Sequence, residues 1–148
     1  MGGMYSYILL THILAATIWT GGHLVLALTV LPRALKARDP RILLDFEAGY
    51  ERVGMPALVI QIATGLWMAT LLLPSHADWF SGDTLQSKLI MLKLALLAIT
   101  AVTALDARLR IIPRLTAATL PAMARRVTLV TLVSVLFVIV GVAFRGGL

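Results

Sequence analysis

The chain has no cysteine and few charged residues, acidic ones least of all. Of its 148 residues 14% are charged, seven of them Asp or Glu, whereas soluble domains usually carry about 25%. The lack of cysteine excludes disulfides, thiolate metal sites and a cysteine nucleophile. The low charge, with 59% hydrophobic residues and a mean hydropathy of +0.93, excludes a soluble enzyme, a disordered tail and a nucleic-acid-binding module.

Long apolar runs are what the chain has in abundance, and they indicate an integral membrane protein. A helix needs about 20 residues to cross the hydrocarbon core, and continuous apolar runs favour helices over a β-barrel. We therefore predict an all-α, four-helix transmembrane bundle in one membrane domain. The spans are expected at about residues 5–31, 55–73, 86–110 and 126–145.

The segments between the spans carry most of the positive charge. All of the 13 Lys and Arg residues except Lys88, Lys93 and Arg145 lie between the first and second spans, or in the loop between the third and fourth spans and the span ends that adjoin it. The positive-inside rule therefore predicts that both basic loops are cytoplasmic and both termini lie outside, on the periplasmic side. The net charge of +6 is then a topology signal and does not predict a nucleic-acid partner.

Two local features bear on how the spans are built. The residues from Asp39 to Arg52 form an amphipathic pattern, which predicts either a short helix on the membrane surface or an extension of the second span. Pro56 is expected in the first turn of that span, where its missing N–H does no harm. Leu31-Pro32-Arg33 and Ile112-Pro113-Arg114 end the first and third spans. This echo marks either two related hairpins or the same interfacial chemistry used twice.

Polar residues inside the spans are the candidates for function, because lipid rejects them. His12 and His23 fall within roughly 20° of each other on one helix face, about 16 Å apart along the axis, with Trp19 on the same stripe. A neutral imidazole can bind haem iron, copper or zinc, or it can bridge two helices by a hydrogen bond. The separation predicts that the two histidines do not share one metal ion.

Two further intramembrane residues extend the candidate site. Met68 shares a helix face with Gln61 and Gly65, so its thioether is a candidate ligand for Cu(I) or haem iron, or a packing residue. Lys93 lies well inside the third span and needs a carboxylate, a carbonyl or an anionic ligand unless it snorkels to the surface. A haem propionate or a quinone oxygen would suit it. Arg52 is also a candidate cofactor-binding residue.

The run HILAATIWTGG from His12 to Gly22 resembles the first helix of the CopD-like copper-resistance D domain family, and also that of the small haem-containing HemJ-type membrane proteins. Further similar segments are Leu31-Pro32-Arg33, Glu51-Arg52, Thr64-Gly65-Leu66-Trp67, Lys88, Lys93 and residues 107–113. The resemblance implies a four-helix protein of the bacterial inner membrane. Its CopD side implies copper homeostasis or transport. Its HemJ side implies haem b bound through His12, with an important lysine at Lys88 or Lys93.

Three functions are therefore weighed. The first is a haem b protein with a redox or electron-transfer role, acting with a quinone, a porphyrin or a redox protein; whether it is a membrane oxidoreductase is left open. The alternative is a copper carrier or sensor that uses His12, His23 and Met68. The third is an accessory subunit of a larger membrane complex, whose polar residues serve helix contacts. A homo-oligomer is compatible with each of them.

Overall fold

A computed structural model describes residues 2–146, which form helices joined by short loops. The elements are α1 (Gly2–Val25), a π-helical segment (Leu26–Val30), α2 (Leu31–Ala37), α3 (Pro40–Leu72), a 3-10 turn (Asp78–Phe80), α4 (Leu85–Asp106), a second π-helical segment (Ala107–Ile111), a 3-10 turn (Ile112–Arg114) and α5 (Leu120–Ala143). Within these described residues, four helical stretches are long and apolar enough to cross a membrane: Gly2–Ala37, Pro40–Leu72, Leu85–Arg114 and Leu120–Ala143. The predicted all-α, four-helix membrane protein is confirmed.

Polar side chains and one left-handed residue set the helix boundaries. Arg38 adopts a φ of 52° and ends α2, after which Asp39 caps α3 by accepting a hydrogen bond from the Arg41 amide at 2.9 Å. Thr84 caps α4 in the same way, through the Ser87 amide at 3.1 Å. Such caps satisfy backbone N–H groups that have no partner within the helix. The turn between α2 and α3 is therefore tight, and α3 starts directly after it.

Helix α3 is longer than the predicted second span because residues 39–52 extend it, which was one of the two alternatives. Leu43 is fully buried in this extension and packs in the hydrophobic core, so the extension belongs to the bundle. Pro56 consequently lies inside α3, and the expectation that it occupies the first turn is wrong. A proline within a helix removes one backbone hydrogen bond, which membrane helices tolerate because neighbouring groups can satisfy the freed carbonyl.

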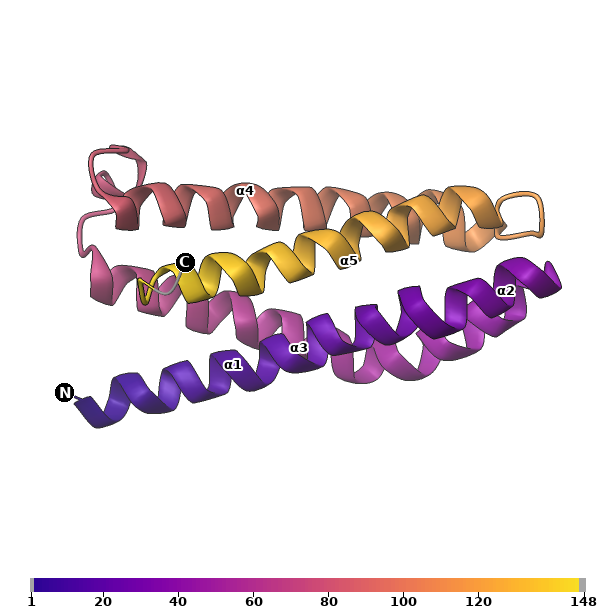
Figure 1. Cartoon of the computed structure of the whole chain (residues 1–148), viewed down its shortest axis with the longest axis horizontal. Helices are drawn as coiled ribbons and strands as arrows, with labels where there is room; N and C mark the ends of the chain where they lie inside the picture. Colours follow the sequence, from indigo (N-terminus) through magenta and orange to yellow (C-terminus); the bar gives the residue numbers. More distant parts are fainter. Residues whose placement is uncertain (1, 147–148) are drawn as a thin grey trace.

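The helices pack as two antiparallel pairs. Helix α1 lies along α3, α4 lies along α5, and α1 also contacts α5 across the pairs. Figure 1 shows the start of α1 and the end of α5 at one end of the bundle and α2 at the other. A buried apolar cluster fills the α2 end; it consists of Leu26, Val30, Leu31, Ala34, Leu43, Ala107, Met123 and Val127. Both π-helical segments contribute to this cluster.

The outer surface of the bundle is apolar along its length. Tyr7, Leu28, Val102 and Leu109 are each exposed by between 68% and 74%. Large exposed side chains of this kind would be costly in water but face the hydrocarbon of a bilayer favourably. The apolar residues therefore either pack inside the bundle or face the lipid. The polar residues that point into the bundle need a different explanation.

Candidate functional site

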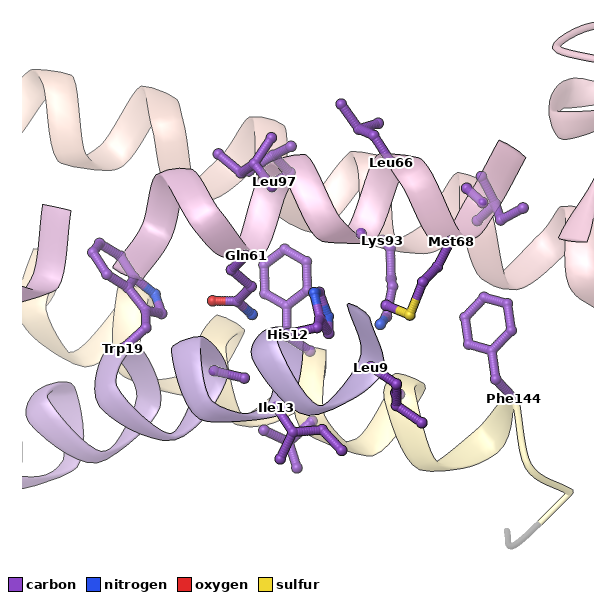
Figure 2. Close-up of a pocket in the computed structure, with 18 of the residues that line it drawn as sticks. Leu9, His12, Ile13, Trp19, Gln61, Leu66, Met68, Lys93, Leu97 and Phe144 are labelled. Carbon is purple, nitrogen blue, oxygen red and sulfur yellow. The ribbon is translucent and has the colours of Figure 1, made fainter. Parts of the chain in front are cut away.

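The end of the bundle that carries the termini contains a cavity of about 910 Å³. It lies between α1, α3, α4 and α5, and its volume is near the upper end of the range of about 300–1,000 Å³ for ligand pockets. Most lining side chains are aliphatic or aromatic, and none of the described ones is Asp or Glu. Figure 2 shows the few polar groups that lie among them, including His12, Gln61 and Lys93. The cavity is thus an apolar chamber with a positively charged side.

His12 reaches this cavity from α1, and a hydrogen bond from its ring to α3 determines which ring nitrogen carries the proton. Its Nδ1 lies 2.8 Å from Thr64 Oγ1, and the Thr64 hydroxyl donates its own proton to the Ile60 carbonyl at 2.6 Å. Because a hydroxyl has one proton to donate, Thr64 accepts from the Nδ1–H of His12. A neutral imidazole in this tautomer keeps its lone pair on Nε2. Metal-binding histidines commonly have such an arrangement, since the second nitrogen is held by a hydrogen bond.

The α3 face opposite His12 carries the residues predicted to share it. Gly65 allows the close approach, since a Cβ there would lie 3.2 Å from His12 Cε1. Met68 follows on the next turn, about 4.5 Å further along the axis, and also lines the cavity. Gln61 lines it one turn earlier, and its buried Oε1 has no hydrogen-bond partner among residues 2–146. Gln61, Gly65 and Met68 therefore form one wall of the cavity.

Lys93 enters the cavity from α4. Its Nζ lies 5.3 Å from the centroid of the Phe144 ring, and a Cβ at Gly141 would lie 3.6 Å from it. No carboxylate of residues 2–146 lies within ion-pair distance of Lys93. Arg145 also lines the cavity. The ammonium group is therefore held against an aromatic face, which stabilises a cation only modestly.

His23 lies outside the cavity and packs between helices. Its Nδ1 is 2.8 Å from the Trp19 carbonyl oxygen, and its ring centroid is 4.4 Å from that of Trp19 and 5.6 Å from that of Tyr50. The Tyr50 hydroxyl donates to the Trp19 carbonyl at 2.9 Å. The two histidines share one helix stripe, as predicted, but only His12 faces a space that can hold a ligand.

Tyr50 is the residue that sequence reasoning missed. Its ring occupies the space above Gly22 of α1 and Gly54 of α3, where a Cβ at either glycine would collide with it. The two glycines are the signal that could have revealed a large side chain between the helices. Arg52, a predicted cofactor-binding residue, is exposed and does not line the cavity.

The structure therefore joins some of the predicted site residues and separates others. His12, Trp19, Met68 and Lys93 line one cavity, whereas His23 and Arg52 do not. Within residues 2–146 no group of three or more His, Cys, Asp or Glu side chains could hold a metal ion. A closed four-ligand site of the structural zinc type is thus absent from this part of the chain. Among the described residues that line the cavity, the imidazole of His12 and the thioether of Met68 are the side chains that suit copper.

Comparison with known protein families identifies one match. The model of the CopD family, copper resistance protein D, matches residues 45–145. The matched region includes Met68 and Lys93 but begins after α1, the helix that carries His12. No curated protein and no solved structure matches the chain. The match supports the CopD side of the resemblance noted in the sequence.

Proposed function

Because the chain belongs to the copper resistance protein D family, we propose that it handles copper within the membrane and that the cavity binds the ion as cargo. The family match over residues 45–145 carries this proposal. It supports copper more strongly than haem b, which the sequence alone favoured. The two donors that the cavity offers agree with the proposal, because imidazole and thioether groups suit Cu(I).

His12 and Met68 are the proposed copper ligands. The Thr64 hydrogen bond to Nδ1 leaves the Nε2 lone pair of His12 available, and Met68 lines the same cavity from α3. The mainly apolar walls favour a soft, weakly hydrated ion over a strongly hydrated one. His23, which the copper alternative also included, is engaged with Trp19 and Tyr50 and is left out of the proposed ligand set.

A Cu(I) titration of the purified protein against a competing chelator, under anaerobic reducing conditions, tests this proposal. We expect His12→Ala and Met68→Leu each to weaken Cu(I) binding by about tenfold or more, since each removes one of few donors. The matched controls are His76→Ala and Met91→Leu, because both residues are exposed and neither lines the cavity. Cu(I) binding that is equally tight in the His12 variant and the wild type would refute the proposal.

Haem b is a second candidate, favoured by the size of the cavity. A volume of about 910 Å³ with mainly apolar walls exceeds what a bare ion fills. The residues present fit haem: His12 Nε2 could hold the iron, and Lys93 and Arg145 could pair with the propionates. Bound haem would supply one-electron chemistry. The absorption spectrum of the purified protein, before and after haem is added, tests this candidate. A spectrum without a Soret band in both states would eliminate it.

A further inference from the structure

The two hairpins of the bundle share an unusual backbone feature. The π-helical segment Leu26–Val30 precedes Leu31-Pro32-Arg33, and the π-helical segment Ala107–Ile111 precedes Ile112-Pro113-Arg114. Fewer than about 1% of residues in proteins are π-helical, so two such segments before the same tripeptide pattern indicate more than shared interfacial chemistry. The hairpin of α1 and α3 and the hairpin of α4 and α5 are thus parallel repeats.

The repeat relates the two main polar residues of the cavity. When the two π-helical segments are aligned, His12 falls opposite Lys93. Each of them lies against a glycine of its own hairpin: His12 against Gly65, and Lys93 against Gly141. The two glycines therefore have the same role in their hairpins: each makes room for a polar side chain that enters the cavity from the neighbouring helix.

Several other cavity residues obey the same correspondence, whereas Trp19 and Leu58 pair with Thr100 and Ser134, which do not line the cavity. Aligning the π-helical segments for α1 with α4, and the two glycines for α3 with α5, pairs cavity residues with cavity residues: Ile13 with Leu94, Gln61 with Phe137 and Met68 with Phe144. The cavity is thus formed by equivalent faces of two repeats, one on each side. Positions at which the paired residues differ then show how the two walls of the cavity differ in chemistry.

The partner of the polar residue is the main difference. His12 has the Thr64 hydroxyl as its hydrogen-bond partner, but the position equivalent to Thr64 is Val140, which is apolar. Lys93 consequently has no polar partner from the equivalent position, and its neighbours include the Phe144 ring. A cation among apolar side chains is stabilised far better by an anion than by an aromatic ring. Since none of the described lining residues is acidic, an anionic ligand would supply the negative charge that the cavity lining lacks.

We propose that the cavity binds a single-chain amphiphile with an anionic head group, with the head paired to Lys93 and the chain against the apolar walls. The surrounding bilayer is the natural source of such a molecule, and a long-chain fatty acid has this chemistry. The Lys93 ammonium would donate charge-assisted hydrogen bonds to the head group, and Arg145 lies in the same cavity to add a second positive charge. The proposal concerns the same cavity as copper but requires no metal.

Palmitate binding to the purified full-length protein in detergent, with a chelator present to remove metals, tests the proposal by calorimetry. We expect the wild type to bind palmitate at least tenfold more tightly than methyl palmitate, because the ester lacks the charge. Lys93→Met should weaken palmitate binding by about tenfold or more, and Lys93→Arg should preserve it. Lys88→Met is the matched control, since Lys88 lies on the same helix but is exposed and outside the cavity.

The outcomes separate the head-group chemistries. Lysophosphatidate that binds more tightly than palmitate, with the same dependence on Lys93, would support the anionic site and identify a phosphate as its preferred head. Equal binding of palmitate and methyl palmitate would overturn the proposal, as would undiminished palmitate binding by the Lys93→Met variant. Because metals are absent from this experiment, its failure is distinct from a failure of the copper titration.

Discussion

Replacing Thr64 by Val would test whether α3 orients the His12 imidazole for metal binding. The substitution keeps the shape of the side chain but removes the oxygen that lies 2.8 Å from His12 Nδ1. The Nδ1–H then loses its acceptor, and the ring is free to rotate or to change tautomer. Loss of such a supporting hydrogen bond typically weakens metal binding by about 10- to 100-fold, which corresponds to about 1.4 to 2.8 kcal/mol.

The assay is the Cu(I) competition titration, and Thr70→Val is its control. Thr70 lies on the same helix and its hydroxyl donates to the Trp67 carbonyl at 2.7 Å, but it does not line the cavity. Both variants lose a hydroxyl within the helix, so a general effect on α3 would appear in each. If Thr64→Val binds Cu(I) as tightly as the wild type and Thr70→Val do, the argument that Thr64 orients His12 is refuted.

Two further predictions concern stability, measured as thermal unfolding of the detergent-solubilised protein. Gly22→Ala should destabilise the protein by about 1–3 kcal/mol, because a methyl group there collides with the Tyr50 ring. Gly21→Ala is the control: it has open space around it and should be neutral or stabilising by up to about 1 kcal/mol. Equal changes in stability for the two variants would contradict the packing argument. Asp106→Asn should destabilise by about 1 kcal/mol, since Arg126 Nε donates to its carboxylate at 2.5 Å in a partly exposed pair. High salt should reduce the difference in stability between the wild type and the Asp106→Asn variant. A stability difference that does not depend on salt would argue against an ion pair as its cause.

Local periodicity accounts for the part of the site that the sequence could predict. Gln61, Gly65 and Met68 share a face because their spacing matches the helical repeat, and all three line the cavity. Lys93 was singled out because a charged residue within a span either needs a partner inside the bundle or snorkels to the surface, and in the structure it lines the cavity. Both inferences depend on the spacing of residues along one helix and on the fact that the helix is surrounded by lipid. Both can be read from the sequence of that helix alone.

The choice between the two histidines could not be made in this way. His12 and His23 lie on the same stripe of α1, but Tyr50 of α3 fills the space next to His23 and donates to the Trp19 carbonyl. This contact joins residues from two helices, and no local pattern in either helix predicts it. Arg52 shows a similar limit: its position depends on how far α3 extends beyond the predicted span, which the Asp39 cap and the buried Leu43 determine.

The unequal packing of the two ends bears on how a ligand reaches the cavity. At the α2 end, the apolar cluster is filled, and ion pairs join neighbouring helical segments: Arg108 pairs with Glu51, and Arg126 with Asp106. The same end carries the basic loops, which the positive-inside rule assigns to the cytoplasm. We therefore expect the cavity to lie in the outer half of the bilayer, closed toward the cytoplasm by the packed end. Copper or an amphiphile would then enter from the outer side or from the outer leaflet, and passage to the cytoplasm would require the packed cluster to open.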